Sequence, residues 1–249
     1  GDHRSDEERE KTEKKAMESL NEYWKNLTLY HQIDSLHRAG KGEEPAYNPA
    51  LEAALGAFRG EQVVLIEVDR DKDIESALEW IKGKNIKVVL TGVSEGWRVA
   101  DQIASAKIPV ITGPVLSMPT RTSDRYDRAY ANAGLMLKAG VQVALRTNDS
   151  ENARNLPYHA GFAATYGMGS EAALRAVTIE PARIFGVADQ LGSIEVNKVA
   201  NLFVSDGDPF ETKTQIKHLF ISGSYVPLES RQTYLYDEFL DRDSGAKED

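Results

Sequence analysis

The sequence predicts an α/β chain built on a parallel sheet. Four strands that are apolar almost throughout are predicted over residues 62–68, 86–90, 108–111 and 141–145. Helices are predicted after them over residues 73–82, 95–106, 124–139 and 151–166. Continuously apolar strands are typical of parallel sheets buried on both faces, and strand–helix units in series pair through right-handed crossovers. Four such units form either a small open sheet or half of an eight-stranded barrel, and periodicity does not choose between them.

A long charged segment precedes the first strand. Residues 6–38 place apolar side chains at helical spacing, which predicts an amphipathic helix that needs a surface to lie on. These side chains are Ala16, Leu20, Tyr23, Trp24, Leu27 and Tyr30. Residues 39–49 carry two glycines and two prolines and are predicted to be a linker, after which Asn48 caps a helix that runs to about Arg59.

The stretch from residue 170 to residue 209 is the one around which the chain is organised. Ser170 is expected to cap a helix, and Pro181 to open a second, shorter one. After these helices the spacing of the apolar residues changes from that of a helix to that of a strand. Residues 194–196 and 200–204, separated by Asn197 and Lys198, are predicted to form a hairpin, and residues 216–221 to pair antiparallel with 200–204. Residues 231–242 are expected to form a closing helix.

Composition excludes several classes of function. The 249 residues carry a net charge of −9 and include no cysteine. Nucleic acids and anionic membranes bind clustered Lys and Arg, so neither is an expected partner. Any metal site must use His and carboxylates. No apolar run approaches the length of a membrane span and no leader segment is visible, so a soluble protein, cytoplasmic or periplasmic, is expected and its compartment stays unknown.

The stretch from residue 170 to residue 209 resembles the C-terminal end of the amidohydrolase superfamily, in particular its imidazolonepropionase-like branch. The matching residues are Ala173, Leu174, Ala176, Thr178, Pro181, Ala182, Arg183, Gly186, Gly192, Ser193, Ile194, Lys198, Ala200, Leu202, Asp206, Gly207, Asp208 and Pro209. Asn197 and Asn201 depart from the family pattern. The resemblance extends over residues 48–240, and it places the four strands where the fifth to eighth strands of the family's barrel belong.

The resemblance therefore implies a fold and a division of the chain. The expected fold is the C-terminal half of a TIM-like (β/α)8 metal-dependent hydrolase barrel, with a few strands of the accompanying small β-sandwich. The expected parts are a helical segment and linker (1–47), the partial barrel (48–190), the sandwich strands (191–229), and a helix and tail (230–249). The first four strands, with the family's His-x-His pair, would belong to a longer protein.

The resemblance also implies a metal site. Active members hold a divalent ion, most often zinc, with two His on the first strand, one His on the fifth, one on the sixth and an Asp on the eighth; the ion activates a water. Here the fifth strand ends in Glu67 and Asp69, and the sixth in Thr91 and Gly92. Asp149 matches the general base of the eighth strand, unless Asn148 is the aligned residue. Asp149, Glu67 and Asp69 are thus weak candidate ligands, and this fragment is expected to hold zinc poorly, if it holds any metal.

Four further residues are candidates for contact with a small-molecule substrate. Arg146 and Arg154 could clamp a carboxylate, Trp97 could stack on a ligand, and His159 could face the mouth of the barrel. The other four histidines form no ligand pair in the sequence: His3, His31, His37 and His218.

Three functional hypotheses follow. In the first, the longer protein hydrolyses a cyclic amide or a similar non-peptide C–N bond by a metal-activated water, and this fragment alone is inactive. In the second, it is a metal-poor, non-catalytic binding protein. In the third, the chain is a flavodoxin-like domain complete in itself, which leaves the resemblance unexplained. A half barrel exposes its edge strands, so we expect that edge to be covered either by the N-terminal helix or by self-association with a second copy.

Overall fold

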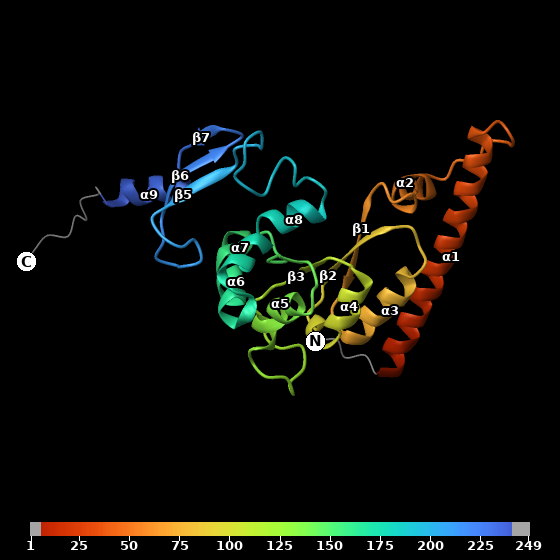
Figure 1. Cartoon of the computed structure of the whole chain (residues 1–249), viewed down its shortest axis with the longest axis horizontal. Helices are drawn as coiled ribbons and strands as arrows, with labels where there is room; N and C mark the ends of the chain where they lie inside the picture. The colour runs from red at the N-terminus through yellow and green to blue at the C-terminus, as the bar shows by residue number, and fades with distance from the viewer. Residues whose placement is uncertain (1–5, 241–249) are drawn as a thin grey trace, which may run out of the picture. The chain divides into compact units, whose positions relative to one another are not determined.

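The computed structural model describes residues 6–240, and it contains the predicted parallel sheet (Figure 1). The strands of this sheet are β1 (Val63–Val68), β2 (Lys87–Gly92), β3 (Val110–Thr112) and β4 (Val143–Leu145). They are adjacent in the order β1-β2-β3-β4. Strands β2, β3 and β4 run parallel, with Leu90 opposite Val110 and Val110 opposite Val143. The predicted strand order is therefore confirmed.

Helices and 3-10 turns connect these strands and follow them. They are α3 (Asp71–Ile81), η1 (Gly96–Arg98), α4 (Ala100–Ala106), α5 (Arg128–Lys138), η2 (Ala153–Asn155), α6 (Leu156–Ala163), the π-helical turn η3 (Ala164–Met168), α7 (Ser170–Ala176) and α8 (Ile179–Ile184). Helices α5, α6, α7 and α8 each contact strand β4 of the sheet. In α5, for example, Asn132, Ala133 and Met136 are buried, and Gly134 admits the backbone of Met168.

By its internal contacts the chain divides into two compact units, residues up to 66 together with 77–89, and residues 67–76 together with 90 onward. The first unit contains α1 (Asp6–Arg38) and α2 (Pro49–Phe58). Leu27 and Tyr30 of α1 and Leu55 of α2 form its buried core. Trp24 packs edge-on against Trp80, at 5.4 Å between ring centroids, so the predicted apolar face of α1 does find partners.

The predicted cap of α2 is confirmed. The side chain of Asn48 accepts hydrogen bonds from the backbone N–H groups of Ala50 and Leu51, and Pro49 occupies the first helical position. Within α1 the predicted apolar face is buried only from Trp24 onward. Ala16, Leu20 and Tyr23 of the same face are exposed.

A separate antiparallel sheet follows α8, in the order β5-β6-β7. Its strands are β5 (Leu202–Ser205), β6 (Ile216–Ile221) and β7 (Ser224–Val226), and α9 (Arg231–Leu240) comes after them. Strand β5 pairs antiparallel with β6, as predicted, with Phe203 opposite Leu219. The closing helix is also confirmed as far as residue 240, and its last two expected positions lie outside the described residues.

The predicted hairpin over residues 194–204 is wrong. Asn197 does adopt the left-handed turn conformation, with φ of 72°, but residues 194–196 form no strand and β5 pairs with β6 instead. The reason is the lack of a packing surface. Ile194 and Val196 are 85% and 91% exposed, so no apolar burial offsets the entropy of ordering a strand there.

Several predicted helix boundaries also need correction. Gly169, with φ of 84°, occupies the cap position of α7, and Ser170 is its first helical residue and makes no side-chain cap. Pro181 lies two residues inside α8. The helices predicted over 95–106 and 151–166 each divide into shorter segments, and the one predicted from Asp124 begins at Arg128. In the part of the chain that the structure describes, no helix is long and apolar enough to cross a membrane.

Candidate functional site

The carboxyl ends of the parallel strands bring three of the singled-out positions into contact. Glu67 near the end of β1 accepts hydrogen bonds from both terminal nitrogens of Arg146, which follows β4, and the contact from Nη1 to Oε2 is 3.0 Å. The hydroxyl of Thr91, on β2, donates to the same Oε2 atom. A guanidinium and a carboxylate that pair through two parallel hydrogen bonds form a strong, oriented contact. The predicted clamp by Arg146 is thus directed at a carboxylate of this chain.

The ion pair changes the protonation of Glu67. The hydrogen bonds from Arg146 hold the pKa of the Glu67 carboxyl below its ordinary value, against the opposing effect of partial burial. Glu67 therefore stays ionised at neutral pH. Its oxygens already accept three hydrogen bonds, which occupies most of the positions that a metal ion would need.

Gly92 lies between Glu67 and the second candidate ligand, Asp69. A Cβ atom at Gly92 would lie 2.8 Å from Asp69 Oδ1 and 3.2 Å from Glu67 Oε1, and its φ is +82°. Only glycine fits both the conformation and the space. Asp69 Oδ1 in turn accepts a hydrogen bond of 2.6 Å from the hydroxyl of Ser94. Two carboxylates thus lie beside one another at this edge, and each is already engaged.

Asp149, the third candidate ligand, is hydrogen-bonded within the local turn that precedes η2. Its Oδ1 accepts the backbone N–H of Glu151 at 2.9 Å, and its Oδ2 accepts the side-chain amide of Asn152 at 3.0 Å. Among the side chains that the structure describes, those of residues 11–240, no group of three or more His, Asp and Glu could hold a metal ion. The donor set at this edge therefore does not fit a metal that is held by this chain alone.

His159 is buried and supports the loop that follows β3. Its Nδ1 accepts the backbone N–H of Val115 at 3.0 Å, so the neutral ring carries its proton on Nε2. Burial lowers the pKa of His159 below 6.5 and favours this neutral form. The structure thus gives this histidine a positioning contact with the loop between Thr112 and Arg128.

A second set of ion pairs holds the same loop. Glu95 is fully buried, and its carboxylate accepts two hydrogen bonds from Arg121 of the loop, at 2.5 Å and 2.7 Å. Arg121 also pairs with Asp71, at 2.7 Å, while Arg98 pairs with Asp124. Sequence reasoning did not select Glu95 or Arg121. The available signal was their position, because each follows a predicted strand on the side where the strands end.

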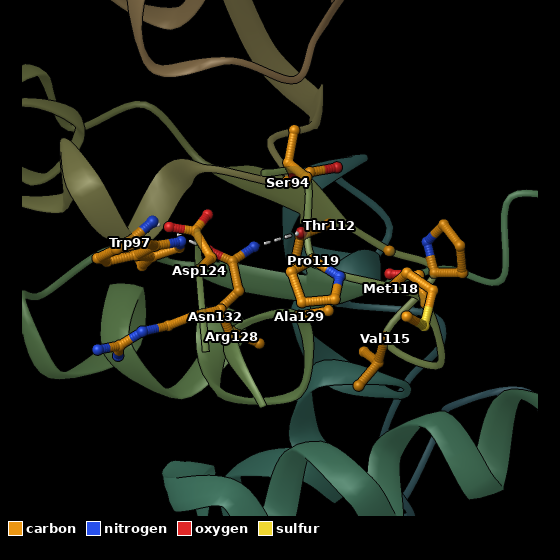
Figure 2. Close-up of a pocket in the computed structure, with 15 residues that line it drawn as sticks. Ser94, Trp97, Thr112, Val115, Met118, Pro119, Asp124, Arg128, Ala129 and Asn132 are labelled. Atoms are coloured by element: carbon orange, nitrogen blue, oxygen red, sulfur yellow. Dashed lines mark hydrogen bonds between the residues drawn. The ribbon is translucent and has the colours of Figure 1, made fainter. Parts of the chain in front are cut away.

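Trp97 lies beside a small hollow under this loop (Figure 2). The guanidinium groups of Arg98 and Arg128 lie 4.1 Å and 4.6 Å from its ring centroid. Its backbone N–H donates to the buried Asn132, whose amide also donates to Thr112. The hollow has a volume of about 40 Å³, which suits a few waters rather than an organic ligand. Arg154 is exposed on η2, and no carboxylate among the side chains described for residues 11–240 pairs with it.

Comparison with known proteins identifies the family to which this chain belongs. The model of the amidohydrolase family matches residues 66–226, which is more than half of the sequence. The chain belongs to the amidohydrolase family. An imidazolonepropionase from Shouchella clausii (strain KSM-K16) is 40% identical over 86 residues, which are 33% of this chain and 19% of that protein. The predicted resemblance to the imidazolonepropionase-like branch is therefore confirmed.

Solved structures confirm the α/β fold class. An amidohydrolase from Thermotoga maritima MSB8 superposes with a TM-score of 0.75 and 26% identity, over 84% of this chain and 54% of that one. A Xaa-Pro dipeptidase with bound methionine superposes with a TM-score of 0.54 and 16% identity, over 74% of this chain and 50% of that one, which is a likeness of fold alone. The chain thus spans about half the length of these two structures and about a fifth of the imidazolonepropionase.

The Glu67–Arg146 pair predicts a measurable coupling. In a double-mutant cycle with Glu67→Gln and Arg146→Met, we expect a coupling energy of about 1 kcal/mol at neutral pH, because Glu67 is more than half exposed and solvent weakens the pair. Since the folded-state pKa lies below 4.5, the coupling should be complete above pH 4.5 and vanish as the pH falls through that lowered value. Urea unfolding of the four proteins measures it, and a coupling of zero at pH 7 would contradict the geometry.

The contact of His159 predicts a pH dependence. Because its pKa is lowered by folding, the stability that the neutral ring contributes is complete above pH 6.5 and decreases as the pH falls below it. The variant His159→Asn keeps an acceptor near the position of Nδ1 but does not titrate. We expect the free energy of unfolding of the variant to fall less than that of the wild type on acidification below pH 6.5. Equal slopes for the two proteins would show that His159 is not the titrating group.

Proposed function

We propose that the whole protein binds a small polar molecule at the carboxyl edge of its parallel sheet, and that this chain contributes to the site without holding a metal ion. The observation that carries the proposal is the contact of Arg146 with Glu67 and Thr91. These three side chains come from the strands that match the eighth, fifth and sixth strands of the family. A guanidinium cation pairs with the carboxylate at the edge where the family's resemblance led us to expect ligands to an ion.

The chemistry of the Arg146–Glu67 pair suits the binding of a ligand by this chain better than the hydrolysis of one. Arg146 carries a permanent positive charge, so it can orient and stabilise a polar or anionic group of a ligand. It cannot generate a hydroxide nucleophile as a metal ion does, because it has no open coordination position for water. The edge is also closely packed, since Gly92 fits between Glu67 and Asp69, and Arg121 of the neighbouring loop is hydrogen-bonded to Glu95. Trp97 and Arg154 are proposed as secondary contacts of the ligand.

A second candidate function is hydrolysis of a non-peptide C–N bond, such as that of a cyclic amide, by the whole protein. The 40% identity to an imidazolonepropionase favours it. In this case a divalent ion, zinc by preference, would be held by residues outside this chain. Asp149 is the residue of this chain proposed as the general base, and its release from the turn of η2 would be required first.

Metal content and turnover of the whole protein separate the two candidates. We expect the protein, purified with its upstream residues, to contain no stoichiometric zinc, to bind its ligand equally before and after chelation, and to leave cyclic amides intact. Arg146→Met should weaken ligand binding by about tenfold, the loss of one charged contact. Arg183→Met is the matched control, because Arg183 pairs with Glu180 away from the sheet edge. One equivalent of zinc, with cleavage that chelation abolishes, would overturn the first candidate.

We further propose self-association of this chain through the free edge of the sheet. Leu65 of the outer strand β1 is 52% exposed, and an open apolar edge favours pairing with a second copy. Light scattering of the purified chain should give the mass of a dimer or a larger assembly. Leu65→Lys should shift the mass to that of one chain, and a wild-type mass of one chain would contradict the proposal.

A further inference from the structure

A second hollow lies away from the sheet edge, between helix α6 with the turn η3 and the loop that follows β5. Its volume is about 550 Å³, enough for a small organic molecule. The side chains that give it chemical character are four aromatic rings and two carboxylates. They are Tyr158, Phe162, Tyr166, Phe210, Asp208 and Glu211. None of them belongs to the site around Arg146.

The rings of this hollow are fixed by packing within the protein. Tyr130 of α5 contacts Phe162 at 5.5 Å and Tyr166 at 5.0 Å between ring centroids. The rings of Phe162 and Tyr166 are parallel to within 5°. Phe162 nevertheless remains 42% exposed. An aromatic surface is therefore held in place on one side and open on the other, so little ordering would be needed when a ligand binds.

Phe210 is brought to the hollow by a close contact with α6. A Cβ atom at Gly161 would lie 3.1 Å from the Cβ atom of Phe210, so the absence of a side chain at Gly161 allows this approach. The loop that carries Phe210 is itself closed by Asp208, whose Oδ1 accepts the backbone N–H of Phe210 at 2.9 Å. The geometry of this wall of the hollow is thus specified by the sequence.

The charge of the hollow is negative. Asp208 and Glu211 line it, no Lys or Arg does, and no basic side chain among the described residues 11–240 forms an ion pair with either carboxylate. By comparison, Asp206 on the same loop pairs with Lys217 at 2.8 Å. Ring faces carry a negative quadrupole and attract cations, and nearby carboxylates add a full negative charge.

We propose that this hollow is a binding site for a small organic cation of the alkylammonium or quaternary ammonium class. The rings of Phe162, Tyr166 and Phe210 contact the alkyl groups, and Asp208 and Glu211 supply the opposing charge. The hollow is large enough for a trimethylammonium group. Its aromatic surface favours this ligand class over inorganic cations, because inorganic cations need converging oxygen ligands.

Choline and its neutral isostere, in which a tert-butyl group replaces the trimethylammonium group, test the proposal. Titration of each into the full 249-residue chain is followed by the NMR signals of the residues around the hollow. We expect choline to shift these signals saturably and to bind about tenfold more tightly than the isostere, because the two differ only in charge. Equal binding of the two compounds, or no saturable shift with choline, would overturn the proposal.

Two variants assign the contributions of the ring and the charge. Phe162→Leu should weaken choline binding by about threefold, while Phe185→Leu, a ring with 48% exposure at the end of α8, should leave it unchanged. The double variant Asp208→Asn with Glu211→Gln keeps the acceptor for Phe210 and should weaken choline binding by about threefold without changing that of the isostere, because the rings still attract the cation. Unchanged choline binding in this double variant would exclude the hollow as the site.

Discussion

One ion pair, between Glu67 and Arg146, determines what the carboxyl edge of the parallel sheet can do. The two residues come from the outer strands of a four-stranded order, so their side chains meet across the ends of β2 and β3. The pair also gives the edge a fixed cation, and it lowers the charge that two neighbouring carboxylates would otherwise present to a metal.

The loops around this edge are fixed by buried polar contacts. Glu95 is fully buried, and an unpaired charge there would destabilise the fold, so its ion pair with Arg121 is required. The ring of His159 accepts a hydrogen bond from a backbone N–H of the loop that carries Arg121. These contacts come from residues on different strands and helices, yet they converge on the one loop between β3 and α5. The edge is thereby organised in advance, which is the property that a binding site requires.

The sequence predicted the parallel sheet, the second sheet and the cap at Asn48, because each depends on local period and on residues with strong conformational preferences. It failed where tertiary packing decides. Ile194 and Val196 have the pattern of a strand but no surface to cover them, and Ser170 gave way to Gly169 as the cap because the chain enters α7 with positive φ. For the candidate site, the sequence predicted which residues lie at the strand ends but not which of them are in contact. Glu67, Thr91 and Arg146 were each visible in the sequence, but the pairing of Arg146 with Glu67 depends on which strand ends and side chains the fold brings within reach of each other.

The central claim is that the guanidinium of Arg146 engages both carboxylate oxygens of Glu67, so that Glu67 is not free to bind an ion at this edge. The most direct measurement is nitrogen NMR of the arginine side chains during a titration of the chain with zinc. We expect the Arg146 terminal N–H protons to exchange slowly, because both nitrogens donate to Glu67, and to keep their signals unchanged as zinc is added. In Glu67→Gln the slow exchange should be lost. Saturation of the Arg146 signals by one equivalent of zinc, with release of the guanidinium from Glu67, would contradict the account.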